Sequence, residues 1–216
     1  MNKILIYLRL HIGKKLRKNK NFFDRQKWKI YNGNSKKHPT IISQNCTGGV
    51  MSHDLGLQFT SPTINLFMES EDYIKFLENL EYYLSIDANQ IEFIQDSPYP
   101  VGYLEDIKIY FVHYNSEEEV IEKWNIRKSR VDMNNLFIIM TDRDGCTDEI
   151  FNRFINLSFK NKIFYSHSKK DNNCVIYMPC FKHENQVGGL TDFCNILGKR
   201  YYAKYFDYIK WLSKKQ

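Results

Sequence analysis

Short apolar runs alternate with segments of helical periodicity along most of this chain. Runs of about four to eight apolar or alternating residues, bounded by polar or turn-forming residues, are typical of buried strands. Such runs predict strands at residues 40–43, 106–113, 136–140, 162–165 and 174–179, with one more short apolar run at 66–68.

Apolar residues three and four positions apart predict helices between these strands. One segment starts at Ser70 and stays periodic through Leu84, and another follows the capping box formed by Ser116 and Glu119. The same periodicity covers 147–157 and 203–214. Strands that alternate with amphipathic helices predict an α/β fold. We expect a three-layer sandwich with a mostly parallel or mixed central sheet, in a single domain over residues 38–216.

Two further stretches predict irregular structure. Gly48 and Gly49 follow the first strand directly, which favours a sharp turn. Pro98 and Pro100 punctuate a stretch through Leu104 that we interpret as a loop forming the wall of a pocket.

The positive charge of the chain is concentrated in a basic N-terminal arm, residues 1–37. The whole chain carries a formal charge of +6, but the arm holds twelve Lys or Arg and one acid, so it is +11 and the rest is −5. Because the body is acidic, nucleic acid is not an expected partner. The arm suits a peripheral helix on the anionic inner face of the membrane. Five of its basic residues would then face the headgroups: Lys14, Lys15, Arg17, Lys18 and Lys20. The alternative is a helix docked on the domain, with a solvated basic end.

Cysteine spacing and the start of the chain bear on location. The five cysteines show no C-x-x-C spacing, which indicates free thiols in a reducing cytoplasm. The apolar stretch 4–12 is interrupted by Arg9 and His11, and it is far shorter than the roughly 20 residues that cross a bilayer. We therefore expect a cytoplasmic protein that associates with the inner face of the membrane.

The segment Ser43–Gly49 is the first candidate site, because ligands in open α/β sheets bind at the carboxyl ends of strands. Cys46 is a candidate nucleophile and His53 its local base. Asn45 and the amides of Gly48 and Gly49 could bind an oxyanion or a phosphate, and Ser43 would help to hold the substrate. The alternative is a packed cysteine beside an ordinary turn.

A second candidate site follows the apolar strand 136–140. Asp142 and Asp144 form an Asp-x-Asp pattern that could present two carboxylates to Mg²⁺ or Mn²⁺ and to the diphosphate of a donor, with Arg143 as a substrate-binding residue. Asp and Gly also favour turns without any metal. His113, which closes a strand, is a further candidate base for Cys46, and His183, which precedes a second Gly-Gly pair, could also approach Cys46 in space and bind the substrate. The alternative for both is an ordinary polar residue at the end of a strand.

Several motifs in a fixed order make the chain resemble a known bacterial family. They are Ile42-Ser-Gln-Asn-Cys-Thr-Gly-Gly49, Leu55-Gly-Leu-Gln-Phe-Thr-Ser-Pro-Thr-Ile-Asn-Leu-Phe67, Tyr99-Pro-Val-Gly102, His113-Tyr114, Lys123-Trp-Asn-Ile-Arg-Lys-Ser-Arg130 and Thr141-Asp-Arg-Asp-Gly145. This series is similar to that of the domain of unknown function 1919, whose members are often labelled exopolysaccharide or capsule biosynthesis proteins. The resemblance implies an α/β fold and a role in surface polysaccharide synthesis, and it brings no established reaction.

These observations lead to two hypotheses. The first is a transferase of exopolysaccharide or capsular polysaccharide biosynthesis that modifies a sugar or a lipid-linked oligosaccharide. Acyl transfer from acyl-CoA through Cys46 or a histidine base is slightly preferred, and glycosyl transfer from a nucleotide sugar at Asp142 and Asp144 comes next. The second hypothesis is a non-catalytic accessory protein that binds a glycan or nucleotide within a synthesis complex.

Overall fold

A computed structural model describes residues 3–33 and 37–214 of the chain. The helices are α1 (Lys3–Asn32), α2 (Thr47–Leu55), α3 (Ser70–Glu78), α4 (Leu80–Ser85), α5 (Glu117–Lys128), α6 (Asp148–Asn156) and α7 (Tyr208–Leu212). The strands are β1 (Thr40–Ser43), β2 (Glu92–Phe93), β3 (Val101–Leu104), β4 (Ile107–Tyr110), β5 (Leu136–Thr141), β6 (Lys162–Ser166) and β7 (Val175–Tyr177). Short 3-10 turns are η1 (Ala88–Gln90), η2 (Met133–Asn135), η3 (Pro179–Phe181) and η4 (Tyr201–Ala203).

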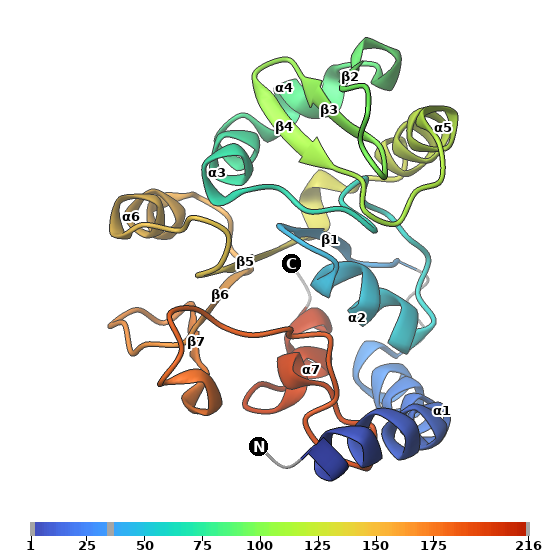
Figure 1. The fold of residues 1–216 in the computed structure, drawn as a ribbon, viewed down its shortest axis with the longest axis vertical. Helices are drawn as coiled ribbons and strands as arrows, with labels where there is room; N and C mark the ends of the chain where they lie inside the picture. Colours follow the sequence, from blue (N-terminus) through green and yellow to red (C-terminus); the bar gives the residue numbers. More distant parts are fainter. Residues whose placement is uncertain (1–2, 34–36, 215–216) are drawn as a thin grey trace.

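The centre of the molecule is a parallel sheet with the strand order β1-β5-β6-β7 (Figure 1). Ile42 pairs with Ile138, and Met140 pairs with Phe164. Because all of these strands run in one direction, their carboxyl ends meet at one edge of the sheet. The predicted α/β class is confirmed.

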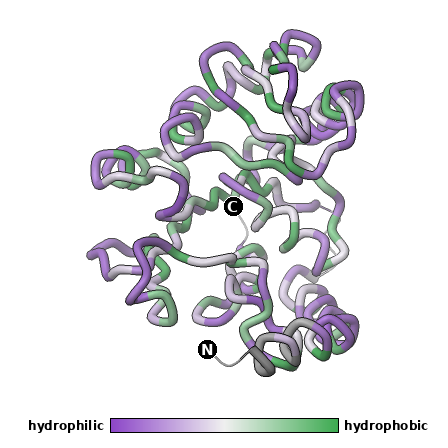
Figure 2. Tube along the Cα trace, viewed as in Figure 1, coloured by the Kyte–Doolittle hydropathy of each residue, from purple (hydrophilic) through white to green (hydrophobic). Residues whose placement is uncertain are grey.

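Alternate residues of each central strand face opposite sides of the sheet, as strand geometry requires. Ile42 and Ile138 belong to the hydrophobic core on the upper side, whereas Ile41, Phe137 and Ile139 belong to the core on the lower side. Strand β5 is buried along its whole length, which explains why its sequence is almost continuously apolar. Figure 2 shows this hydrophobic centre between more hydrophilic outer layers.

The lower layer consists of α1, α2 and α7 (Figure 1). Helix α2 begins at Thr47, so the predicted turn at Gly48 and Gly49 is wrong: both glycines lie in the first turn of a helix. The reason is close packing, because a Cβ atom on Gly48 would lie 2.8 Å from side-chain atoms of both Ile41 and Ser43. Glycine at this position lets α2 rest directly on β1.

The upper layer consists of α3, α5, α6 and a small antiparallel sheet with the order β2-β3-β4 (Figure 1). The interpretation of residues 98–104 as a loop is wrong in its second half, because Val101–Leu104 forms β3 and pairs with Ile107–Tyr110. The predicted helix from Ser70 to Leu84 is divided at Asn79 into α3 and α4.

Helix α1 packs against the body of the protein along one side. Trp28 is buried in the lower core, and Arg17 is buried in an ion pair with Asp54 of α2. The expectation that Arg17 faces lipid headgroups is therefore wrong, because Arg17 faces inward. Residues 1–2 and 34–36 of the predicted arm lie outside the described residues. Across the described ranges, 3–33 and 37–214, no helix combines the length and the apolar character that a membrane span requires.

Candidate functional site

A pocket of about 290 Å³ lies at the carboxyl edge of the central sheet, where β1 and β5 end side by side. Three parts of the chain line most of it: residues 45–47 after β1, residues 143–144 after β5, and residues 188–191 near the C-terminus. Phe67 and Val112 complete the wall. This edge is the usual ligand position in open α/β sheets, and the pocket volume is close to the lower end of the range for small-molecule sites, about 300 Å³.

Gln44 holds the two strand ends together beneath the pocket. Its side-chain oxygen Oε1 accepts hydrogen bonds from the amide (3.1 Å) and the hydroxyl (2.9 Å) of Thr141. Its Nε2 donates to Ser70 Oγ at 3.0 Å, and Ser70 Oγ donates to the carbonyl of Arg143 at 2.7 Å. Gln44 is completely buried. A buried, satisfied network of this kind fixes the loop after β5 relative to the loop after β1.

Cys46 is the N-cap residue of α2 and borders the pocket. Its thiol points toward the carbonyl oxygen of Leu66, with a sulfur–oxygen distance of 3.8 Å. Burial raises the pKa of the Cys46 thiol above its ordinary value. The thiol is therefore protonated at neutral pH, which is the unreactive form of cysteine.

The predicted partners of Cys46 near α2 lie in different surroundings. Asn45 lines the pocket, and its Oδ1 accepts hydrogen bonds from the amide (3.1 Å) and hydroxyl (2.7 Å) of Thr47. Gly48 lies against β1, and Ser43 is buried below it with a hydroxyl that has no hydrogen-bond partner in the described part of the chain. Gly49 packs against Ile64 instead. Thr47 is the residue of α2 that lines the pocket, and the amide end of the helix at this position carries partial positive charge.

The three predicted histidines do not gather around Cys46. His53 is exposed in the last turn of α2, about two helical turns from Cys46. His113 is exposed directly after Val112 of the pocket wall, and His183 is exposed in the segment after η3. Among the described residues, the pocket lining contains no histidine.

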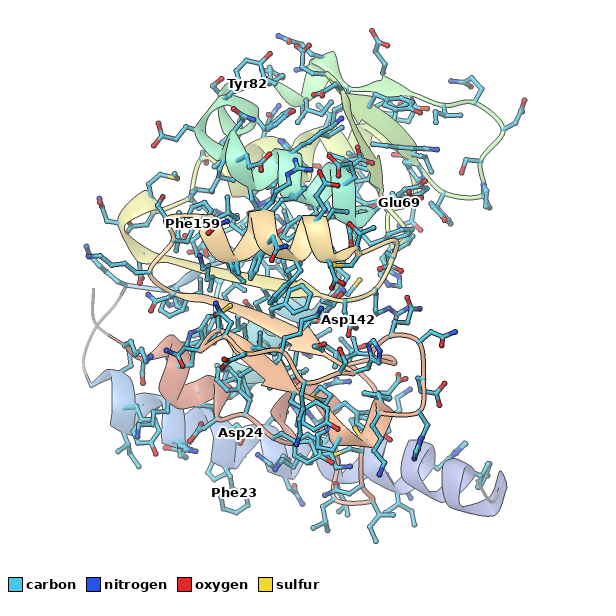
Figure 3. The ribbon with its side chains drawn as sticks, turned by 90° about the vertical axis from the view of Figure 1, so that its left-hand side faces the viewer. Phe23, Asp24, Glu69, Tyr82, Asp142 and Phe159 are labelled. Carbon is cyan, nitrogen blue, oxygen red and sulfur yellow. The ribbon has the colours of Figure 1, made fainter. Side chains whose placement is uncertain are left out.

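Asp142 links three loops of the carboxyl edge. Its Oδ1 accepts a hydrogen bond from the amide of Val187 at 2.8 Å. Its Oδ2 accepts from Ser166 Oγ at 3.0 Å and from the amide of His167 at 2.6 Å, and His167 Nδ1 lies 2.5 Å from the same oxygen. Both carboxylate oxygens thus accept hydrogen bonds from the protein. Asp142 lies between the upper layer, with α6, and the lower layer, with α1 and α7 (Figure 3). Asp142 positions the segments after β6 and before Gly188.

Arg143 and Asp144 are the charged residues of the pocket wall. Burial raises the pKa of Asp144, Arg143 opposes this effect and Glu69 adds to it. Asp144 adopts a left-handed backbone conformation with φ of 58°, which is uncommon for a residue other than glycine. The conformation is held by the hydrogen bond from the Ser70 amide to the Asp144 carbonyl (2.9 Å).

The two aspartates are not arranged as a free pair of metal ligands. Asp144 lines the pocket, whereas Asp142 gives both oxygens to protein donors. No cluster of three or more His, Cys, Asp or Glu side chains suited to a metal ion occurs among the residues that the structure describes. The metal site at Asp142 and Asp144 stays a prediction.

The opposite wall, Gly188–Thr191, is held by charged residues of the lower layer. The guanidinium of Arg200 donates a hydrogen bond to the carbonyl of Thr191, and its Nε donates to Asp54 Oδ2 at 2.8 Å. Asp54 is also the partner of Arg17. The pocket wall is thereby connected to α2 and to α1.

Several site residues escaped the sequence analysis. Gln44 lies inside the quoted motif 42–49, and its signal was a polar residue directly after the predicted strand 40–43. His167 follows the predicted strand 162–165, and its signal was a histidine at a strand end, as for His113. The wall at Gly188–Thr191 was marked in the sequence only by its Gly-Gly pair. This is a weaker indication, because nothing in the sequence places the pair opposite Cys46.

A family model described as "Domain of unknown function (DUF1919)" matches residues 13–213. The chain belongs to the DUF1919 family. A protein of Haemophilus influenzae described as uncharacterized is 42% identical over 176 residues, which cover 81% of this chain and 84% of that protein. The resemblance predicted from the ordered motifs is therefore confirmed.

In this DUF1919 protein the pocket combines a carboxyl group, a guanidinium, a helix N-terminus and an aromatic side chain. Arg143 and the first turn of α2 complement negative charge. Asp144 is a carboxylate whose raised pKa makes it a better proton acceptor than an ordinary aspartate. Phe67, stacked on Tyr110 with ring centroids 4.4 Å apart, offers a rigid apolar surface. The pocket thus brings a carboxyl group, a guanidinium and an aromatic ring together at the carboxyl edge of the sheet.

Proposed function

We propose that the protein is a transferase of surface polysaccharide biosynthesis, which transfers a group from a phosphate-bearing donor to a hydroxyl of a sugar. The observation that carries the proposal is the pairing of Asp144 and Arg143 in one pocket at the carboxyl edge of the sheet. Asp144 would accept the proton of the sugar hydroxyl. Arg143 and the N-terminus of α2 would balance the negative charge of the donor and of the leaving group.

Glycosyl transfer from a nucleotide sugar is the version that we favour. It needs a general base and a positively charged group for the diphosphate, and Asp144 and Arg143 of the pocket could supply them. Acyl transfer through a Cys46 thioester has less support, because burial raises the pKa of Cys46 and no histidine lines the pocket within the described residues. The proposed acceptor is a lipid-linked glycan, so the protein would act in the cytoplasm at the inner face of the membrane.

The first test of this proposal is ligand binding. UDP-glucose, other nucleotide sugars and acetyl-CoA would be added to the protein with and without Mg²⁺ or Mn²⁺, and the melting temperature measured. A ligand at 100 times its Kd stabilises the folded state by about 2.7 kcal/mol, which corresponds to roughly 5–10 °C for a chain of this size. We expect a nucleotide sugar to give this shift. A shift with acetyl-CoA alone would instead favour acyl transfer.

Two variants separate binding from chemistry. Arg143→Gln should remove most of the shift, because it removes the charge that faces the donor. Asp144→Asn should keep the shift but lower product formation by about 10²- to 10⁴-fold, the usual contribution of a general base. Asp171→Asn, an exposed aspartate in the segment between β6 and β7, is the matched control and should change neither quantity. Binding without turnover in the parent protein would favour the accessory-protein hypothesis.

A further inference from the structure

The outward side of helix α1 exposes large apolar side chains that no other part of the described chain covers. Phe22 is 57% exposed, Phe23 is 66% exposed and Ile30 is 77% exposed. Ile12, Phe23 and Ile30 are spaced at seven or eleven residues, so they form one stripe along the helix. Figure 3 shows Phe23 pointing away from the body at the edge of the molecule.

A basic stripe runs beside these apolar residues. Lys15, Lys18 and Lys29 are exposed. Lys18 lies three residues after Lys15 and four before Phe22, and Lys29 lies seven after Phe22, so all of them share one side of the helix. The acid of the helix is turned the other way: Asp24 is buried and pairs with Lys20. The outward face is therefore apolar and cationic, with its negative charge hidden.

A cationic pocket of about 390 Å³ borders this face. It lies between α1 and residues 199–209 and is lined by Lys20 and Lys27 from the helix and by Lys199 and Lys204 from the opposite side. Lys20 and Lys27 are paired with Asp24 and Asp207. Among the described residues, Lys199 and Lys204 make no ion pair, which leaves an excess of positive charge in the pocket. Phe23 lies one turn from both helix lysines, so the pocket and the exposed face adjoin.

We infer that the outward face of α1 is a docking surface for an anionic lipid bilayer, on which the helix lies parallel to the membrane. Phe22, Phe23 and Ile30 would enter the boundary between headgroups and acyl chains, and the lysines would contact the phosphates. Charge complementarity selects this occupant, because a second copy of the same basic face would repel the first.

This docking surface would orient the protein on the membrane. The inference rests only on the proposed location of the protein at the inner face of the membrane. It does not depend on the reaction in the pocket at β1 and β5, because the two sites share no residue. Loss of membrane binding would therefore leave ligand binding at the strand ends unchanged, and the two proposals fail independently.

Sedimentation with vesicles tests the docking surface on the full chain. The vesicles would contain phosphatidylcholine alone or an equimolar mixture with phosphatidylglycerol, at low and high salt. We expect the protein to bind the anionic vesicles at least about tenfold better than the neutral ones, and salt to weaken this binding. Equal binding to both, or no binding, would overturn the inference.

Variants locate the surface. The pair Phe22→Ser and Phe23→Ser should lower vesicle binding about tenfold or more, because it removes two apolar anchors. The pair Lys15→Glu and Lys18→Glu should also lower it at least about tenfold and reduce its salt dependence. Tyr82→Ser in α4 is the matched control: Tyr82 is 53% exposed but lies at the opposite end of the molecule (Figure 3).

Two further measurements complete the test. Circular dichroism and the melting temperature of each variant should match those of the parent, because the substituted side chains are exposed. Light scattering after size exclusion should give a monomer. A dimer that the phenylalanine variant dissociates would assign the face to self-association and contradict the membrane inference, as would full vesicle binding by both α1 variants.

Discussion

Burial acts on two side chains of the candidate site with opposite consequences. Burial raises the pKa of the Cys46 thiol and of the Asp144 carboxyl. For a thiol the change removes the nucleophilic thiolate at neutral pH. For a carboxyl the change moves its proton affinity closer to that needed for general base catalysis. The same physical effect thus makes the Cys46 thiol a weaker nucleophile and the Asp144 carboxylate a stronger base.

Cys46→Ser tests this contrast. The variant keeps the size of the side chain and removes the thiol, so we expect product formation to stay within about tenfold of the parent and the melting temperature to change little. Alkylation of Cys46 by iodoacetamide should increase only above the ordinary thiol pKa of about 8.5. Loss of product by orders of magnitude, together with labelling well below pH 8, would restore Cys46 as the nucleophile.

At the scale of elements, the site depends on how two strand ends are joined. Strands β1 and β5 end in different loops, and Gln44 bonds to Thr141 and to Ser70 at the start of α3. Ser70 in turn holds the carbonyl of Arg143. A single buried amide therefore sets the relative position of the residues before Cys46 and of the charged pair in the pocket.

Gln44→Ala should lower the free energy of unfolding by about 2–4 kcal/mol, because it leaves the buried partners of the amide unsatisfied and opens a cavity. It should also weaken ligand binding at the pocket, since Arg143 loses its indirect support. Urea denaturation measures the first effect, and the ligand-induced melting shift measures the second. Gln58→Ala, at an exposed position, is the control. Unchanged stability would show that the network is not needed to join the strands.

At the scale of the whole molecule, Asp54 connects the N-terminal helix to the pocket wall. It is buried on α2 and bonds to Arg17 of α1, to Arg200, and to the hydroxyl of Tyr202 at 2.5 Å. Burial alone would raise the pKa of Asp54, but the two arginines and the tyrosine outweigh it and lower the pKa. Segments distant in sequence thus meet at one carboxylate.

Asp54→Asn should destabilise the protein by about 3–5 kcal/mol near neutral pH, because the buried Arg17 and the partly buried Arg200 lose their charged partner. The sign of the pH dependence follows from the lowered pKa. The stabilisation is complete above the unfolded-state pKa of about 3.9 and is lost as the pH falls toward the folded-state pKa.

Stability curves at several pH values, read from urea denaturation, would show this acid-dependent loss in the parent and a flatter curve in the variant. Asp207→Asn is the matched control: its exposed pair with Lys27 should contribute only about 0–1 kcal/mol. Equal effects of the two substitutions would contradict the special role of Asp54.

Local patterns were sufficient for most of the central layer. The strand at residues 136–140 was predicted because its residues are buried on both faces and therefore continuously apolar. The strands at 40–43 and 162–165 were predicted from shorter apolar runs at 41–42 and 163–165. The helix after Ser116 was predicted because its cap is local, and the structure shows the Glu119 amide donating to Ser116 Oγ. Patterns of this kind are properties of neighbouring residues, so the order of amino acids contains them.

Contacts between distant segments were not predictable in this way. Gly48 suggested a turn, yet it lies in α2, where glycine is needed because a Cβ atom would collide with Ile41 and Ser43 of β1. Arg17 had the same appearance in sequence as the exposed Lys18, yet one is buried against Asp54 and the other faces solvent. Asp142 and Asp144 belong to one sequence motif, but in the folded chain Asp142 bonds to protein donors and Asp144 lines the pocket. Burial, ion pairing and pKa depend on what the folded chain brings alongside each residue, and one-dimensional periodicity does not contain that information.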